Sequence, residues 1–318
     1  MKNIITILVF IIGVFFHLLL PAQQSSFQEL HGKYFGLKPP GMTAELFAPG
    51  IISTYSNEHS ALAFSPDGSV VLWAIMDSNY KGGLFEMKYI NGTWSKPATP
   101  SFADTNADYY APSFSIDGRI LFFSSRRKAP EGYPEGRGNR LWSIEKTSNG
   151  WGTPVPIDTS VSRAQEFSHS ISKSGTLYFS ALPSSGDNMD IYKAEKTNTG
   201  YTKPALLASP INSTGYEDGP YISPKEDFLI FESTRPEGIE GSHDLYITFK
   251  DKKGHWGAPI NMGPKVNSPG MERFPRLSPD GKYLFFGSNR DQSNGKVGFD
   301  IYWIDAKIIK ELKKQVKK

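Results

Sequence analysis

Short apolar runs recur along the chain, each preceded by a tight polar turn and followed by a polar loop. The runs combine aromatic and β-branched residues over a few positions, which is typical of β-strands and too short for helices. In the turn Ser65-Pro66-Asp67-Gly68, Pro presets φ, Asp bonds its own backbone, and Gly accepts a positive φ. The turn serines lie 50 to 57 residues apart and are Ser65, Ser115, Ser172, Ser223 and Ser278. A repeat of this length predicts stacked units that share a core.

Each repeat carries signals for four short strands. After the apolar run and a polar loop comes a second apolar stretch, such as Asp300-Ile301-Tyr302 in the last repeat. An aromatic residue then precedes Pro by three positions, as in Trp151 and Pro154, and leads into a short final strand. The 30 Gly and 23 Pro among 318 residues suit the many turns. We therefore predict an all-β fold, a single β-propeller with five four-stranded blades.

The ends of the repeat array predict how the ring closes. The fifth repeat lacks its fourth strand, because after Ile304 the chain enters a Lys-rich tail. Residues 43–48 resemble the fourth strands of the other repeats. We predict that this N-terminal strand completes the last blade and removes its open edge. The propeller then spans residues 43–304 and follows a lead-in at 24–42.

The first residues predict export. Lys2 is followed by an apolar run from Ile4 to Leu20 and then by polar sequence, which is the pattern of a secretory signal peptide over residues 1–23. An uncleaved membrane anchor is the alternative, because the run is close to the length of a spanning helix. Either reading puts the propeller outside the cytoplasm, in the periplasm or secreted.

The C-terminal tail, residues 305–318, has apolar residues at helical spacing with Lys on the other side. We expect a short helix that caps the last blade; a helix lying on a membrane surface is the alternative. The apolar positions are Ile308, Ile309, Leu312 and Val316.

Charge and composition exclude several classes of function. The formal net charge of the chain is +3. Lys2 and the Lys-rich tail together carry a net positive charge larger than this total, so the remaining residues, which form the propeller, are slightly acidic. Nucleic acid binding requires a basic face on the domain and is therefore not expected. The chain has no Cys, which excludes disulfides and thiolate metal sites, and its 6 His are scattered singly. We expect no metal site and no cofactor.

The repeat resembles a known family. Ser278-Pro279-Asp280-Gly281, followed by the run to Arg290 and by Asp300-Ile301-Tyr302, is similar to the TolB-type, WD-forty-like propeller repeat. The opening at 36–51 resembles exported Bacteroidetes proteins of this group, and the resemblance covers roughly 35–304. It implies the fold and not one activity, since such propellers serve as periplasmic scaffolds, binding modules and substrate gates.

The resemblance also implies site positions. The family usually has Glu six residues before the repeat serine and Arg at the end of the second strand. One interpretation is a ring of structural Glu–Arg pairs, since buried carboxylates need partners; the other is a ligand site at the channel mouth. The matching residues are Glu166, Glu217, Glu272, Arg126, Arg235 and Arg290.

Departures from the repeat are the second set of candidates. His59 and Tyr109 replace the Glu, with Glu58 and Asp108 one residue earlier. Asp77 and His169 depart from the pattern in the first and third repeats; His169 stands where other repeats have Pro. Irregular residues in three consecutive repeats indicate ligand contacts on one side of the channel mouth; the alternative is that edge repeats drift without a functional reason.

No catalytic motif occurs: the sequence has no Gly-x-Ser-x-Gly and no His-Glu-x-x-His. We predict a non-catalytic exported propeller that binds an envelope protein or a cell-wall glycan at the channel mouth. The alternative is a glycan-active hydrolase or lyase with an acid/base pair in the channel. A third hypothesis is a structural module whose tail docks elsewhere, so that deleting 305–318 abolishes binding without unfolding the ring.

Overall fold

The computed structural model describes residues 27–316, apart from 60–61, 80, 134–137, 158–164, 183–187, 240–242 and 292–294. The predicted signal peptide at 1–23 therefore lies outside the described residues. Within the described part of the chain, no helix is long and apolar enough to cross a membrane.

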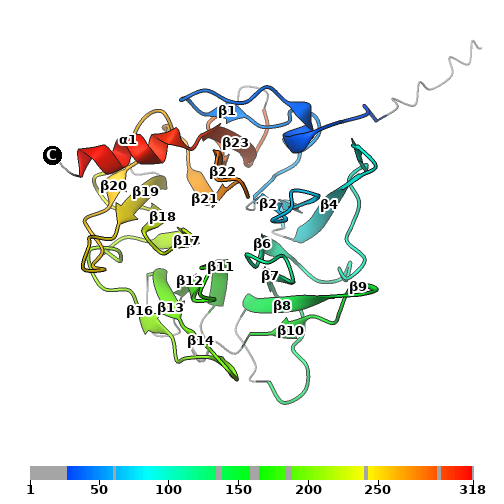
Figure 1. Ribbon diagram of the computed structural model, residues 1–318, viewed down its shortest axis with the longest axis horizontal. Helices are drawn as coiled ribbons and strands as arrows, with labels where there is room; N and C mark the ends of the chain where they lie inside the picture. Colours follow the sequence, from blue (N-terminus) through cyan, green and yellow to red (C-terminus); the bar gives the residue numbers. More distant parts are fainter. Residues whose placement is uncertain are drawn as a thin grey trace, which may run out of the picture.

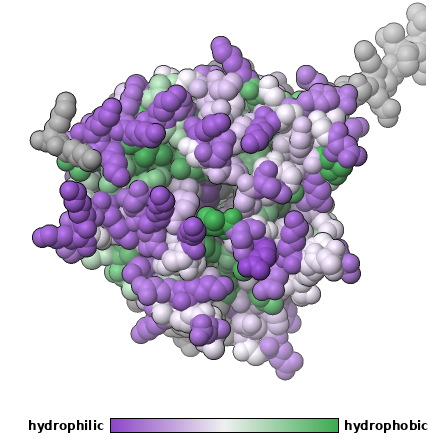
Figure 2. All heavy atoms as spheres, viewed as in Figure 1, coloured by the Kyte–Doolittle hydropathy of each residue, from purple (hydrophilic) through white to green (hydrophobic). Residues whose placement is uncertain are grey.

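Five antiparallel blades surround a central axis, which confirms the predicted five-bladed propeller. In Figure 1 the innermost strands of the blades, β2, β6, β11, β17 and β21, face one another around the centre. The face shown in Figure 2 is hollowed near this axis, with hydrophobic atoms beside the hollow and mostly hydrophilic side chains farther out.

In the first two blades the predicted second and third strands are the long ones. In blade 1, β5 pairs only with the end of β4, and a single bridge between Glu86 and Ala98 stands where the other blades have a regular outer strand. Blade 1 consists of β2 (Ala63–Phe64), β3 (Val70–Met76), β4 (Gly82–Ile90) and β5 (Thr93–Trp94). Blade 2 consists of β6 (Tyr110–Phe114), β7 (Ile120–Ser125), β8 (Arg140–Thr147) and β10 (Val155–Pro156), and β9 (Gly150–Trp151) pairs with the end of β8.

Blades 3 and 4, like blade 2, have the full set of four strands. Blade 3 consists of β11 (Gln165–Ile171), β12 (Leu177–Leu182), β13 (Asp190–Ala194) and β16 (Ala205–Leu206), with a small hairpin of β14 (Lys196–Thr197) and β15 (Gly200–Tyr201). Blade 4 consists of β17 (Glu217–Ile222), β18 (Phe228–Ser233), β19 (Asp244–Phe249) and β20 (Ile260–Asn261).

The last blade joins the two ends of the chain. It consists of β21 (Glu272–Leu277), β22 (Tyr283–Ser288), β23 (Asp300–Asp305) and the N-terminal β1 (Glu45–Leu46). Glu45 lies opposite Trp303, and the Phe47 amide donates to the Ile301 carbonyl at 2.8 Å. Phe47 is fully buried, with its ring 4.9 Å from that of Trp303. The predicted closure by an N-terminal strand is confirmed. A 3-10 turn, η1 (Lys33–Gly36), precedes it.

The repeat turns form as the sequence predicts. The Ser65 hydroxyl donates to Asp67 at 2.6 Å, and the Val70 amide donates back to Ser65 at 2.9 Å. Gly68 has φ of +73°, which a side chain would strain. Blade 4 has Glu226 at φ +56° in the corresponding position. Its carboxylate accepts from Tyr178 of blade 3 at 2.9 Å and so links the two blades.

Hydrophobic clusters lie between neighbouring blades, because both faces of each sheet are apolar. One cluster joins Tyr178 and Ile191 of blade 3 to Leu229 and Phe231 of blade 4. The side chains of these four residues are at most 1% exposed. The blades therefore share their core, as expected for repeats that stack around a ring.

The tail forms helix α1 (Lys307–Gln315), which packs across blades 4 and 5 and not on the last blade alone. Ile308, Ile309 and Leu312 are buried in a cluster with Phe249 of blade 4 and Leu284 of blade 5. Figure 1 shows the helix outside β20, β19 and β23.

The packing of α1 predicts that the tail stabilises the ring. Leu312→Ala is expected to lower the free energy of unfolding by about 2–4 kcal/mol, because it empties a buried site. Val316→Ala, at a side chain that is half exposed, is the matched control and should cost less than about 0.5 kcal/mol. Urea unfolding measures both. Equal stability of Leu312→Ala and wild type would favour a dispensable tail.

Candidate functional site

Two of the predicted Glu–Arg pairs form and are buried. Glu217 accepts from Arg235 at 3.2 Å, and Glu272 accepts from Arg290 at 3.1 Å. Each carboxylate also accepts from a serine hydroxyl four residues earlier, at 2.6 Å, and from a serine near the end of the second strand, at 2.7 Å. Both carboxylate side chains are fully buried. These contacts satisfy the carboxylates and tie the loop before each blade to its second strand.

Blades 1 and 2 build the same contact from the residue one position before the predicted one. Glu58 accepts from Lys296 Nζ at 2.8 Å and from the Thr54 hydroxyl at 2.6 Å. Asp108 accepts from Arg126 at 2.6 Å. Arg126 is thus paired as the pattern suggests, whereas His59 and Tyr109 do not take the place of the Glu.

Blade 3 has the Glu without an Arg at the end of its second strand. Glu166 Oε2 accepts from the backbone N–H of Leu141, on the neighbouring blade 2, at 3.1 Å. The side chain is 4% exposed. Glu166 therefore also connects adjacent blades.

Three of the irregular residues are held by internal contacts. Tyr109 is buried, and its hydroxyl accepts from the Asp104 amide at 2.7 Å. Asp77 accepts from the amides of Asn79 and Lys81 at 2.8 and 2.9 Å, which caps the turn between β3 and β4. None of Tyr109, Asp77 and His169 lines the cavity at the mouth described next.

His169 is fully buried between blades 2 and 3, where Nε2 lies 2.8 Å from the Ser113 hydroxyl. Burial and the positive charge of Arg276 lower the pKa of His169 to about 3. The imidazole is therefore neutral at pH 7.

A ring of five residues surrounds one end of the channel, and each blade contributes a different side chain. In blades 1, 3, 4 and 5, the ring residue comes immediately after the buried carboxylate in the sequence. In blade 2 it comes two positions after Asp108. The ring residues line a cavity of 330 Å³ together with Met76, Arg126, Gln165, Met189 and Phe274. The ring consists of His59, Tyr110, Phe167, Asp218 and Arg273. We call this end the variable mouth.

Arg273 organises the charges of the variable mouth. It donates through Nε to Glu232 at 2.6 Å and through Nη2 to Asp218 at 3.2 Å, and Nη1 lies 3.3 Å from His59 Nε2. Burial and the charge of Arg273 lower the pKa of His59 to about 3. Burial and the positive charge of Arg273 together therefore keep the neighbouring imidazole neutral.

The pKa values of the two carboxylates beside Arg273 are shifted in opposite directions. Burial and the neighbouring Glu232 raise the pKa of Asp218. Burial alone would raise the pKa of Glu232 too, but Arg273 and His243 hold it below its ordinary value. Asp218 faces Glu232 across the β17–β18 ladder, and the Ser180 hydroxyl of blade 3 donates to Asp218.

Asp218 and Glu232 were not among the residues singled out from the sequence. An alignment of the repeats could have indicated Glu232. The residues at the same position in the other blades are Ala74, Ser124, Ser180 and Gly287. All four are small residues, so a large charged residue at this position in one blade is a candidate for function, whereas a constant residue supports the fold. Among the described residues, no group of three or more His, Asp and Glu is placed to hold a metal ion.

Comparisons with known proteins give similarity of fold. No protein-family model and no curated protein match the chain. The endo-arabinase of Bacteroides thetaiotaomicron is 16% identical with a TM-score of 0.52, covering 80% of this chain and 96% of that one. A putative TolB of Agrobacterium tumefaciens is 20% identical with a TM-score of 0.48, covering 73% and 70%.

A third structure, TolB of Acinetobacter baumannii, is 14% identical with a TM-score of 0.42. The match covers 78% of this chain and 54% of that one, so the chain spans about half the length of that TolB. The protein is a β-propeller structurally similar, at low identity, to TolB-like propellers and to glycosidase propellers.

Proposed function

We propose that the protein is an exported, non-catalytic propeller that binds an envelope glycan at the variable mouth. The observation that carries this proposal is the ring of five different side chains around a 330 Å³ cavity at one end of the channel. A cavity of this volume suits a small ligand or the end of a chain, because ligand sites start at about 300 Å³. A flat protein interface needs no such hollow.

The chemistry of the lining favours a sugar. Tyr110, Phe167 and Phe274 offer aromatic surface to the apolar faces of sugar rings. Arg126, whose side chain is 44% exposed, and Gln165 offer donors and acceptors for hydroxyl groups. The signal-like sequence at 1–23 supports an extracytoplasmic location, where envelope glycans are the abundant sugars.

The bonding of the carboxylates argues against catalysis. Glu217 and Glu272 are buried in ion pairs, and Glu232 is fully buried against Arg273. Asp218 is the one carboxylate among the described residues that line the cavity. Glycoside hydrolysis canonically needs two carboxyl groups that flank the scissile bond.

One observation favours a glycan-active hydrolase or lyase as the second candidate. Asp218 and Glu232 are cross-strand neighbours with pKa values shifted in opposite directions, which is the pattern of an acid and a base. In this candidate Asp218 donates the proton, and Glu232 must leave Arg273 to act.

Binding to an array of peptidoglycan-strand and lipopolysaccharide oligosaccharides tests the proposal. We expect selective binding that Phe167→Ala and Tyr110→Ala each weaken about tenfold, since each removes about 1.4 kcal/mol of aromatic contact. Tyr201→Ala, at an aromatic residue of the outer hairpin β14–β15, is the matched control and should bind like wild type. Binding unchanged in both mouth variants, or binding of envelope proteins but no glycan, would contradict the proposal.

A further inference from the structure

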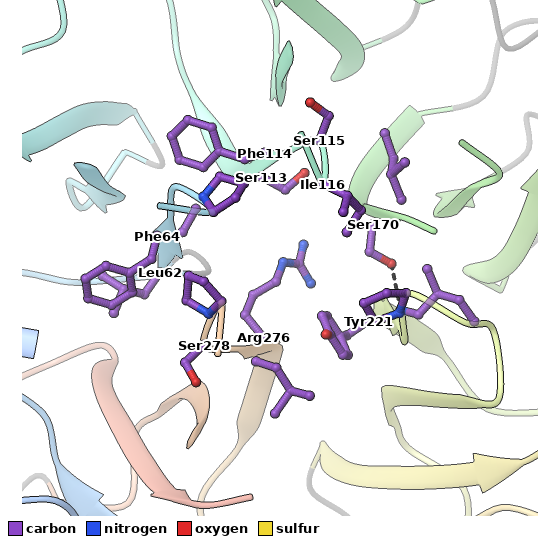
Figure 3. Close-up of a pocket in the computed structure, with 17 residues that line it drawn as sticks. Leu62, Phe64, Ser113, Phe114, Ser115, Ile116, Ser170, Tyr221, Arg276 and Ser278 are labelled. Atoms are coloured by element: carbon purple, nitrogen blue, oxygen red, sulfur yellow. Dashed lines mark hydrogen bonds between the residues drawn. The ribbon is translucent and has the colours of Figure 1, made fainter. Parts of the chain in front are cut away.

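The opposite end of the channel contains a second, smaller cavity of 190 Å³. Strand β17 runs from one end to the other: Asp218 lines the variable mouth, and Tyr221 lines this second cavity. The repeat turns surround it, and all five blades contribute to the lining (Figure 3). We call this end the turn mouth, defined by Leu62, Ile116, Ser170, Tyr221, Pro224 and Arg276.

Arg276 lies at the centre of the turn mouth and is only 5% exposed. Its Nη1 donates to the carbonyls of Pro275 at 2.8 Å and Pro220 at 3.3 Å, and its Nη2 donates to the carbonyl of His169. The Nε–H is buried and has no hydrogen-bond partner among the described residues. Within the described part of the chain this guanidinium forms no ion pair, and Asp218, which pairs with Arg273, acts on it only from a longer distance.

Three of the five N–H groups of this buried guanidinium are used in these bonds, so two donors, Nε–H and one Nη2–H, and a net charge remain to be satisfied within the described part of the chain. A buried donor without a partner costs about 1–3 kcal/mol, and an uncompensated buried charge costs more. Burial lowers the pKa of Arg276 to about 10, so the side chain still carries its charge at pH 7. An anion supplied from outside would meet both needs.

The strand register places hydroxyl groups at the level of Arg276. The same position of the innermost strand holds Ser113 in blade 2, Ser170 in blade 3 and Tyr221 in blade 4. Ser170 accepts from the Ile222 amide at 2.9 Å, which leaves its own proton free to donate (Figure 3). The Tyr221 hydroxyl makes no hydrogen bond among the described residues, and Figure 3 shows its ring beside Arg276.

We propose that the turn mouth binds a carboxylate carried on a small apolar body. The carboxylate accepts from the free N–H groups of the Arg276 guanidinium and from the hydroxyls of Tyr221 and Ser170. The apolar body packs against Leu62, Ile116 and Pro224. A single charge fits better than a phosphate, because the mouth offers one cation and an apolar rim. The ligand is either a free organic acid or the C-terminal carboxylate of a peptide.

The test uses 3-methylbutanoate as the probe and its neutral amide as the matched control. In the ¹⁵N-labelled full-length protein, we expect the Arg276 Nε–H resonance to shift saturably with the acid, and at least tenfold more weakly with the amide. Tyr221→Phe, which keeps the ring and removes only the hydroxyl, should weaken binding several-fold. An acetylated tripeptide ending in valine, compared with its C-terminal amide, distinguishes a peptide terminus from a free acid.

Phe167→Ala, at the variable mouth, should leave carboxylate binding at the turn mouth unchanged. A failure of carboxylate binding can therefore be distinguished from a failure of glycan binding. Equal responses to acid and amide, an Arg276 resonance that does not move, or full binding by Tyr221→Phe would each overturn the proposal. Because the resonance is observed in the wild-type protein, the outcome does not depend on whether a variant of Arg276 folds.

Discussion

Glu217→Gln is expected to lower the free energy of unfolding by about 3–5 kcal/mol, as found when one partner of a buried ion pair is removed. The Glu217 side chain is fully buried and bonds Arg235, Ser213 and Ser233. Glutamine has the same shape but leaves the Arg235 guanidinium without its counter-charge in the interior. Urea unfolding at pH 7 measures the effect.

The matched control for this prediction is Glu237→Gln, because Glu237 is exposed. Its stability should stay within about 0.5 kcal/mol of wild type. A Glu217→Gln protein as stable as wild type that has lost turnover of a glycan would instead make Glu217 a catalytic residue. Loss of stability with glycan binding retained would support the structural role.

Acid is expected to destabilise the fold strongly between pH 6.5 and pH 4. Burial, together with Arg276 and Arg273 respectively, lowers the pKa of His169 and of His59 to about 3. The unfolded chain takes up a proton on each imidazole near pH 6.5, and the folded chain does not until near pH 3. Each neutral histidine therefore contributes stability above pH 6.5 that is lost, at about 1.4 kcal/mol per pH unit, as the pH falls.

Urea unfolding at pH 7, 6, 5 and 4.5 tests this dependence. The raised pKa values of Asp218 and Glu272 act in the opposite direction, whereas the lowered pKa values of Glu226 and Asp280 add to the loss at the acid end, so the wild-type slope combines several groups. The comparison with His169→Asn isolates one histidine and should remove about 1.4 kcal/mol per pH unit. His255→Asn, at a side chain that is 77% exposed, should keep the wild-type slope. An unchanged slope in His169→Asn would refute the assignment.

The fold was predictable because the repeat encodes it several times over. The serine turns, the apolar runs and the strand at 43–48 each predicted the same ring, and the register of Glu45 with Trp303 confirms its closure. Turn chemistry is local, so a few residues such as Ser65, Asp67 and Gly68 determine it.

The site was less predictable because neighbouring residues exchange roles. Tyr109 occupies the strand position of Glu217, yet Asp108 makes the bond to Arg126 while Tyr109 fills the core. Sequence spacing alone does not show which of two adjacent side chains turns inward. Asp218 lies directly after a regular Glu, and its difference from the other blades appears only when that position is compared in all five.

The most direct test of glycan binding without catalysis is the mass of a captured oligosaccharide. Wild-type protein, in stoichiometric excess over an oligosaccharide selected on the array, would be incubated for a day before the sugar is released and weighed. The account predicts that the sugar is retained and recovered at its original mass, and that Phe167→Ala retains little of it. Recovery of shortened fragments, and their disappearance in Asp218→Asn, would contradict the account and establish an enzyme.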